Sequence, residues 1–364
     1  MHLEKFDFKG KRSGTVYFNH AYWRQLLPNT QEKLVGLIAE NKGESLPSEG
    51  RNRFFPLDSA IQTKDGTIRT FRIKAGFPAE PLKPYRGPGY VQYPIRVDKN
   101  GFIFQGEEAQ VNPEGAAQAQ FAKWEFKVAC DLGPQVTDHA VGFGQFSDLR
   151  YFNTPLGFTI FGQESAQDLR LRDNFIDPYT DALRVKRELN IDVKGITPLA
   201  PLVLRFGQSL RTFHRQYIHV YPHFRNVGVI PESFSSGQPV GQKVVIRDLE
   251  TSIALSALNP KQRFTYFAID LLKILGSLWN IEMKFDGLNY PKRELIDNFM
   301  QGYFKEQLSP ALLYHQKADA LFIAVNVTLG QSPNHLNLAD FLEQHPSAFA
   351  RFLYERIERQ VFSE

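Results

Sequence analysis

The hydrophobic pattern of the chain changes near residue 166, and this change sets the fold class. Before it, segments such as residues 67–74 alternate polar and apolar side chains, which is typical of β-strands. After it, apolar residues recur every three or four positions, and residues 263–283 are apolar on most faces of the helix they predict. We therefore expect an α+β protein with two lobes: a β-rich lobe over 1–165 and a mainly helical lobe over 166–364.

Turn and helix signals mark individual elements in both lobes. Lys64-Asp-Gly66 and Asp98-Lys-Asn-Gly101 are typical of tight hairpin turns. Pro346 lacks a backbone N–H, so we expect it to kink or split the last helix. Strands are expected at 67–74, 102–104, 140–143 and 157–161, and helices at 31–41, 116–130, 198–214, 263–283, 312–327 and 338–361.

One helix is expected among the strands of the first lobe. Its apolar positions over 116–130 step by three and four, and Asn112 with the following proline suits a helix start. Leu132-Gly133 is expected to end it. Glu125 lies beside the apolar stripe rather than opposite it.

Composition narrows the class of protein. Hydrophobic residues make up 42% of the 364 residues and charged residues 23%, as in ordinary soluble proteins. The net charge of +4 is small and no dense Lys/Arg run occurs, so we expect no nucleic-acid partner. No apolar run reaches the roughly eighteen residues of a membrane span. We expect a cytoplasmic protein with no membrane partner, and its oligomeric state stays open.

The single cysteine, Cys130, excludes an internal disulfide and a cysteine-based metal site. It lies on the apolar side of the helix expected at 116–130, where a buried thiol is the simplest interpretation. A zinc site from His214, His219 and His223 is disfavoured, because Pro222 breaks the helix that their spacing needs. No Gly-x-Ser-x-Gly turn indicates a serine nucleophile.

A predicted hairpin carries the strongest functional signal. Apolar residues 227–229 and 244–246 flank a stretch rich in Ser, Gly and Pro at 231–241, which indicates two paired strands and their turn. Pairing would bring Asn226 and Asp248 close together at the ends of the strands. An amide oxygen and a carboxylate suit Mg²⁺ that carries nucleotide phosphates. The alternative is that Asn226 caps a turn and that Asp248 caps a helix.

Three cationic residues are candidates for binding phosphate. Lys74 ends the strand expected at 67–74. Arg86 lies in the glycine-containing loop at 83–89, which either cradles phosphates or forms a solvated turn between strands. Arg247 either binds phosphate or forms a salt bridge with Glu250 or Asp248.

The order of these segments resembles that of protein-kinase-like folds. His219-Val-Tyr-Pro-His-Phe-Arg-Asn226 is similar to the kinase catalytic loop, which places a histidine and a metal-binding asparagine seven residues apart. Asp248-Leu-Glu250 resembles the metal-binding Asp-Phe-Gly segment. A β-rich first lobe with one inserted helix, followed by a mainly helical second lobe, is the layout that this resemblance implies.

The resemblance also implies roles for individual residues. Lys74 and Glu125 would form the pair that orients nucleotide phosphates, and Asn226 and Asp248 would bind the metal. His223 would contact phosphate or transfer a proton, or else bond to the backbone as a structural residue. The implied protein is an ATP- and Mg²⁺-dependent enzyme that transfers a phosphoryl or adenylyl group to an unknown small-molecule or protein acceptor.

Departures from the kinase pattern keep two further functions open. Tyr221 stands where a kinase carries its catalytic aspartate, and the first lobe has no Gly-x-Gly-x-x-Gly loop. The selenoprotein O family of AMP-transferring pseudokinases is similar in residues 74–89, and siderophore synthetases independent of peptide synthetases are similar at 222–227 and Arg247-Asp248. The alternatives are a catalytically silent, partner-binding pseudokinase-like protein and an ATP-dependent ligase that activates a carboxylate.

Overall fold

The computed structural model of the 364-residue chain describes residues 1–49, 51–83, 95–105, 112–164, 199–220, 222, 224–231, 242–284, 292–306 and 336–362. They form two compact units. Unit 1 takes the described residues of Met1–Gln92, Glu108–Asp168 and Arg247–Glu250, and unit 2 takes those of Tyr93–Glu107, Leu169–Ile246 and Thr251–Glu364. The sequence predicted a single division after residue 165. Two short segments cross it: residues 95–105 belong to unit 2, and Arg247–Glu250 belongs to unit 1.

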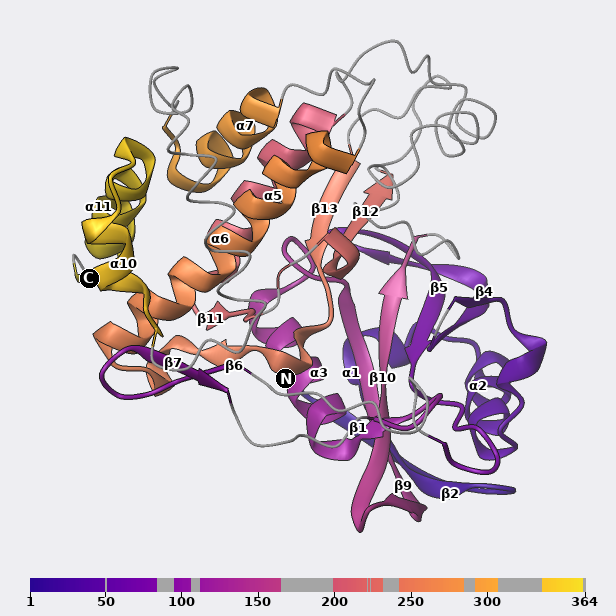
Figure 1. The fold of residues 1–364 in the computed structure, drawn as a ribbon. Coiled ribbons are helices and arrows are strands. Elements are labelled where there is room, and N and C mark those ends of the chain that lie inside the picture. Colours follow the sequence, from indigo (N-terminus) through magenta and orange to yellow (C-terminus); the bar gives the residue numbers. More distant parts are fainter. Residues whose placement is uncertain are drawn as a thin grey trace, which may run out of the picture. The chain divides into compact units, whose positions relative to one another are not determined.

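Unit 1 is built on an antiparallel sheet (Figure 1). Eight of the described strands form it: β1 (Leu3–Lys9), β2 (Ser13–Asn19), β3 (Ser48–Glu49), β4 (Asn52–Thr63), β5 (Gly66–Lys74), β8 (Ala117–Gln118), β9 (His139–Tyr151) and β10 (Thr154–Gln163). The order across the sheet is β1-β2-β9-β10-β5-β4-β3, and β8 pairs with β10. The predicted turn at Lys64-Asp65 joins β4 to β5, where Gly66 has a φ of 140° that favours glycine.

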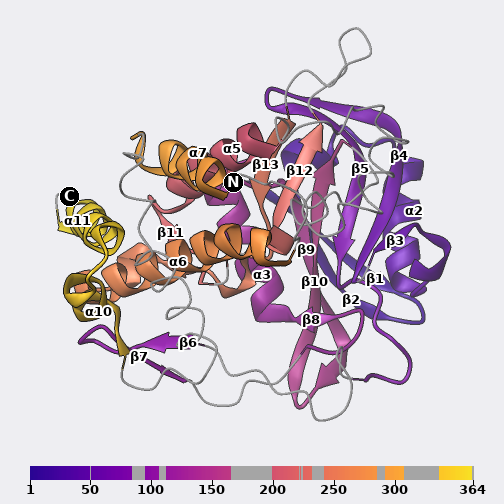
Figure 2. The same cartoon turned by 45° about the horizontal axis from the view of Figure 1, so that its top comes forward.

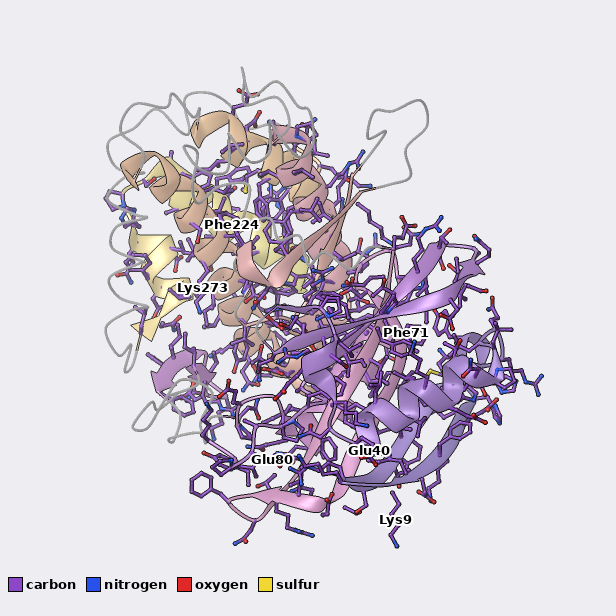
Figure 3. The ribbon with its side chains drawn as sticks, turned by 90° about the vertical axis from the view of Figure 1, so that its right-hand side faces the viewer. Lys9, Glu40, Phe71, Glu80, Phe224 and Lys273 are labelled. Atoms are coloured by element: carbon purple, nitrogen blue, oxygen red, sulfur yellow. The ribbon has the colours of Figure 1, made fainter. Side chains whose placement is uncertain are left out.

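Helices cover both faces of this sheet. The helices α1 (His20–Trp23) and α2 (Pro28–Ala39) lie on one face and α3 (Ala119–Leu132) on the other (Figures 1 and 2). Phe71, labelled in Figure 3, belongs to the apolar core on the α2 side. Other buried members of that core are Phe18, Leu34, Ile38, Phe55, Ile73, Phe158 and Ile160. Burying each such side chain stabilises the fold by about 1.5–3 kcal/mol.

The inserted helix begins later than the sequence predicted. Residues 117–118 pair with β10 at Gly157 and Leu156, so α3 starts at Ala119 rather than at residue 116. The side chain of Asn112 accepts from the backbone N–H of Gln118, one residue before the helix. Gly133 ends α3 with a φ of 75°, as its sequence position indicated.

Unit 2 is mainly helical. Its described helices are α5 (Leu199–Phe213), α6 (Pro260–Lys284), α7 (Lys292–Phe304), α10 (Leu338–Gln344) and α11 (Ala348–Phe362). Helices α5 and α7 lie side by side (Figure 2), and small residues allow this close packing. A Cβ atom at Gly207 would meet the Phe299 carbonyl oxygen at 2.4 Å, and one at Gly302 would meet that of Leu204 at 2.1 Å.

Short strands complete unit 2. The strand β11 (Tyr217–Ile218) pairs with β14 (Ile253–Ala254), and β12 (Val227–Pro231) pairs with β13 (Gln242–Ile246) as the predicted hairpin requires. A three-stranded sheet contains β6 (Ile95–Val97), β7 (Phe102–Gln105) and β15 (Leu336–Asn337). Short 3₁₀ turns lie at Phe224–Asn226, Leu249–Thr251 and Leu255–Ala257, and Gly43–Ser45 forms one in unit 1.

The predicted fold class is confirmed: a β-rich first unit with one inserted helix and a mainly helical second unit. The long apolar stretch forms α6, whose buried residues include Phe267, Leu271 and Leu275. The last helix is split around Pro346 into α10 and α11. The helix predicted at 312–327 lies outside the described residues. Within the described part of the chain, no helix has both the length and the apolar composition needed to cross a membrane.

Candidate functional site

The strand β5 places two cations on the face of the sheet that α3 covers. Arg72 and Lys74 are two residues apart, so their side chains leave β5 on the same face. Lys74 is paired with Thr159 of β10 and with Asn52 of β4. The hydroxyl of Thr159 donates to Glu125 Oε2 at 3.3 Å, which ties α3 to the same row of the sheet.

Lys74 meets three carboxylates, and only 4% of its side chain is exposed. Its Nζ lies 2.9 Å from Glu125 Oε1, 2.8 Å from Asp248 Oδ1 and 3.2 Å from Glu250 Oε2. Glu250 also lies 3.6 Å from a guanidinium nitrogen of Arg51. Three carboxyl groups thus share the two cations Lys74 and Arg51.

This sharing sets the pKa of each group. Burial alone would lower the pKa of Lys74, but Asp248, Glu125 and Glu250 outweigh it and raise that pKa. Burial raises the pKa of Glu125, because one lysine shared with two other acids does not compensate for it. Burial also acts to raise the pKa of Glu250, but Lys74 and Arg51 together lower it.

Asp248 is held in an unusual backbone conformation. Its φ of 56° lies in the left-handed region, which aspartate tolerates better than most residues. The next residue, Leu249, donates its backbone N–H to Glu125 Oε1 at 3.2 Å. The Asp248 side chain remains 31% exposed, so its carboxylate contacts Lys74 while staying accessible to solvent.

A second charged cluster lies beside the first in unit 1. Asp138 Oδ2 accepts from Arg72 Nη2 at 2.8 Å and from Arg247 Nε at 2.8 Å, and Asp138 Oδ1 accepts from Arg247 Nη2 at 3.2 Å. Arg72 also donates to Asn52 Oδ1 at 3.2 Å, and its guanidinium lies 4.6 Å from the centre of the Phe161 ring. One carboxylate thus serves two buried arginines.

Unit 2 contains a separate buried polar network. Asp270 Oδ2 lies 3.1 Å from His214 Nε2 and accepts from the backbone N–H of His219 at 2.9 Å. His214 Nδ1 lies 2.6 Å from the hydroxyl of Tyr303. Both His214 and Asp270 have fully buried side chains. The network therefore fixes the start of the segment that resembles a kinase catalytic loop, and it does so away from solvent.

Lys273, which is labelled in Figure 3, belongs to α6 and lies about one helical turn after Asp270 in the sequence. Its Nζ donates to the Val220 carbonyl oxygen at 3.4 Å. Val220 has a φ of 74°, a rare conformation for a β-branched residue. Burial lowers the pKa of Lys273 to about 8, and Asp270 opposes that shift only in part.

The structure brings together Lys74, Glu125 and Asp248, whose roles in binding phosphate and metal stay predictions. Arg247 has a buried carboxylate as its partner, and its predicted contact with phosphate also stays a prediction. Asn226 is buried in unit 2, in the 3₁₀ turn before β12, and its pairing with Asp248 of unit 1 remains a prediction.

Two further candidates, His223 and Arg86, lie outside the described residues. Across the ranges that are described, no group of three or more His, Cys, Asp or Glu side chains is arranged to hold a metal ion. A metal site that Asp248 forms with described residues would therefore need oxygen ligands of another kind, such as an amide, water or phosphate.

Sequence reasoning missed several residues of these clusters. Arg72 had a usable signal, because it precedes Lys74 by two positions in a strand and must share its face. Asp138 and Asp270 had none, since each is a lone acid whose partners lie far away in the sequence. Arg51 lies next to β4, and only the pairing of β4 with β5 brings it near Glu250.

Comparisons with known proteins add little to this geometry. No family model matches the sequence, and no curated protein matches it. Among solved structures, a chain described as WaaP in complex with acyl carrier protein is similar at a TM-score of 0.36 and 15% identity, over 66% of this chain and 89% of that one. A likeness at this level supports no statement about the activity or partners of the present chain.

Proposed function

We propose that the chain is an ATP- and Mg²⁺-dependent transferase of kinase-like type, which moves a phosphoryl or adenylyl group to a small-molecule or protein acceptor. The observation that carries this proposal is the position of Lys74, buried between Glu125 of α3 and Asp248. A lysine held by a helix carboxylate and poised next to a metal-binding aspartate is the arrangement that kinases use on nucleotide phosphates.

The chemistry of the cluster fits a nucleotide bound with magnesium. Mg²⁺ prefers oxygen ligands and is usually held by one or two carboxylates together with phosphates and water. Asp248 offers a partly exposed carboxylate, and Asn226 is the proposed second protein ligand. The carboxylates of Asp248 and Glu250 beside Lys74 would repel a free triphosphate, so a divalent cation should strengthen its binding. When bound, the ion would neutralise phosphate charge.

The remaining residues take supporting roles in this proposal. Lys74 holds phosphate oxygens, Glu125 orients Lys74, and His223 contacts phosphate or transfers a proton. Arg86 is proposed as a further phosphate contact. Positioning and charge neutralisation supply most of the catalysis in phosphoryl transfer, so a tyrosine at position 221 does not rule out activity.

Binding of ATP with and without Mg²⁺, measured by calorimetry, tests the proposed site. We expect Asp248→Asn and Asn226→Ala each to weaken binding of Mg²⁺·ATP by tenfold or more, and to affect Mg²⁺-free ATP less. The matched control is Asp131→Asn, which removes a surface acid that forms an ion pair with Lys127 on α3. Equal affinity of both variants and the parent for Mg²⁺·ATP would show that the site is wrongly assigned.

The group that is transferred can be identified separately. Incubation of the protein and a cell extract with ATP labelled at either the α- or the γ-phosphate reports which label reaches an acceptor. Transfer of the γ label indicates a phosphoryl transferase, and transfer of the α label indicates an adenylyl transferase. An adenylate that forms on a small carboxylate and then passes to an amine would instead favour the ligase alternative.

A second candidate function is a catalytically silent, partner-binding protein. The observation that favours it is that Lys74 already meets three carboxylates, so a phosphate would have to compete with Asp248 and Glu250. Thermal unfolding with ATP and Mg²⁺ separates the two functions, because a ligand that binds only the native state raises the Tm. No rise at millimolar Mg²⁺·ATP would favour the silent protein.

A further inference from the structure

The segment Arg247–Glu250 is attached to the sheet of unit 1 by two different kinds of contact. Arg247 is 3% exposed and makes a two-point hydrogen-bonded ion pair with Asp138. Asp248, the next residue, contacts Lys74 with a side chain that solvent still reaches. The first contact is sealed inside the unit, whereas an incoming ion can compete for the second.

The proposed function makes different demands on these two contacts. A magnesium ion bound to Asp248 would take over the oxygen that now faces Lys74, and phosphate would take over the lysine. Losing the contact with Lys74 removes one of the attachments that hold the segment on the sheet. The Arg247–Asp138 pair does not involve Lys74, so it can persist through that exchange.

We propose that Arg247 and Asp138 are positioning residues, which hold the segment on the sheet and would keep Asp248 in place if a magnesium ion replaced Lys74 as its partner. The role of the ion rests on the proposed function, whereas the anchoring role rests on the contacts of Arg247 alone. Bidentate pairing matters here, because two parallel hydrogen bonds fix the direction of the guanidinium and hence of the backbone that carries it. Asp248 follows immediately in its left-handed conformation.

Arg72 provides an internal control for this proposal. It donates to the same Asp138 Oδ2 at the same 2.8 Å and is equally buried, but it lies on β5 and not in the Arg247–Glu250 segment. Removing either arginine breaks one buried ion pair with Asp138. Only removal of Arg247 detaches the residue next to Asp248, so a difference between the two variants isolates anchoring from general stability.

The first measurement uses hydrogen exchange without any ligand. The Leu249 N–H, which donates to Glu125, reports whether the segment stays on the sheet. We expect its exchange under native conditions to be at least tenfold faster in Arg247→Met than in Arg72→Met. If either methionine variant fails to fold, the same comparison is made with Arg247→Lys and Arg72→Lys. Lysine keeps the positive charge but cannot donate the two parallel hydrogen bonds of a guanidinium.

The second measurement is the Kd for Mg²⁺·ATP relative to that for Mg²⁺-free ATP. Residues that orient a metal ligand typically change metal affinity by about 10–100-fold when they are replaced. In Arg247→Met and Asp138→Asn, we expect the Kd for Mg²⁺·ATP relative to that for Mg²⁺-free ATP to rise about tenfold. In Arg72→Met, this ratio should stay within about twofold of the parent's.

The outcomes separate this proposal from the proposed function. Equal exchange of the Leu249 N–H in the two arginine variants overturns the anchor, whatever the protein binds. If the Leu249 N–H exchanges faster in Arg247→Met but the ratio of the two Kd values is unchanged, Arg247 holds the segment on the sheet without placing Asp248 for magnesium. A parent protein that binds no Mg²⁺·ATP overturns the proposed function and the ion exchange, while the exchange measurement still decides the anchor.

Discussion

Each of the two units contains a lysine whose surroundings shift its pKa, and the two shifts have opposite directions. Lys74 in unit 1 meets three carboxylates, and its pKa is raised despite burial. Lys273 in unit 2 contacts a backbone carbonyl, and its pKa falls to about 8. Burial acts in the same direction on both groups, so the number of acids within reach decides the sign.

The difference separates two kinds of buried polar cluster. The cluster around Lys74 contains full charges and a partly exposed carboxylate, Asp248, so a ligand can exchange with part of it. The network around Asp270 is closed to solvent and holds the backbone at His219. The charged cluster is therefore the site where we propose that a ligand binds, and the closed network holds the backbone at His219 in place.

The largest expected effect comes from replacing Lys74. Removing one partner of a buried ion pair typically costs about 3–5 kcal/mol, because the other charge is left without compensation. We expect Lys74→Met to lose stability of that order at neutral pH, measured by urea unfolding, and to abolish detectable binding of Mg²⁺·ATP.

The pH dependence of that loss tests its cause. The folded-state pKa of Glu125 is already raised above its unfolded value, and loss of Lys74 raises it further. A raised carboxyl pKa contributes stability that is present below the unfolded pKa of about 4.5 and is lost as pH rises through the folded pKa. The defect of Lys74→Met should therefore shrink toward pH 5, and adding Glu125→Gln should recover part of it at pH 7. A defect independent of pH would show that packing, not charge, is responsible.

For the cluster around Lys74, the sequence predicted which strand and helix carry its residues better than it predicted the contacts between those residues. The period-two strand placed Lys74 at the end of β5, and the helical stripe placed Glu125 on the inner side of α3. Both signals are local, because side-chain direction follows from the repeat of a single element. The order of motifs predicted Asp248 only as a metal ligand beside Asn226, and its contact with Lys74 was found in the structure.

The rest could not be predicted because it depends on pairing across the chain. Asp138 meets Arg247 across 109 residues, and Asp270 meets His214 across 56, with no sequence pattern that links the members of either pair. The start of α3 was predicted three residues early, because a short pairing with β10 overrides helix propensity at Ala117-Gln118. Tertiary contacts thus decided what local patterns left open.

The next effect in size concerns the lysine of unit 2. The unfolded chain holds a proton on Lys273 up to about pH 10.5, whereas the native protein releases it near pH 8. Between these values the unfolded state binds more protons, so the free energy of unfolding should rise with pH, by roughly 3 kcal/mol at most.

Urea unfolding of the parent and Lys273→Met from pH 7 to 10.5 measures this rise. We expect the parent to gain stability over this range relative to the variant, which lacks the titrating group. Lys261→Met, which removes an exposed lysine of the same helix, is the matched control and should follow the parent. If the free energy of unfolding changed with pH in the same way in the parent and in Lys273→Met, the lowered pKa of Lys273 would be contradicted.

A smaller effect is expected from Asp270→Asn. The amide can still accept from the His219 N–H and from His214, but the hydrogen bonds lose their charge. Within the described part of the chain, Oδ1 has no hydrogen-bond partner, so the new NH₂ group would be buried without an acceptor. We expect a loss of about 2 kcal/mol in urea unfolding, with faster hydrogen exchange at His219. Unchanged exchange there would show that Asp270 does not hold this part of the backbone.

The smallest expected effect comes from Tyr303→Phe, and it identifies the tautomer of His214. Asp270 is a carboxylate acceptor, so a neutral His214 must keep its hydrogen on Nε2 and accept from the Tyr303 hydroxyl at Nδ1. That hydroxyl has one hydrogen, and its distance to Nδ1, 2.6 Å, is shorter than the 3.3 Å to Gln360 Oε1. The amide of Gln360 should then be turned so that its nitrogen donates to Tyr303.

Removal of the hydroxyl leaves His214 Nδ1 without its donor, at a cost of about 1 kcal/mol in urea unfolding. Nitrogen NMR shifts of the His214 ring should show the Nε2–H tautomer in the parent and should change at Nδ1 in Tyr303→Phe. Gln360→Leu is the control, because it removes the weaker partner of the hydroxyl and should leave the ring shifts unchanged. Two protonated ring nitrogens in the parent would instead make His214–Asp270 an ion pair, and the closed network would then be charged like the cluster around Lys74.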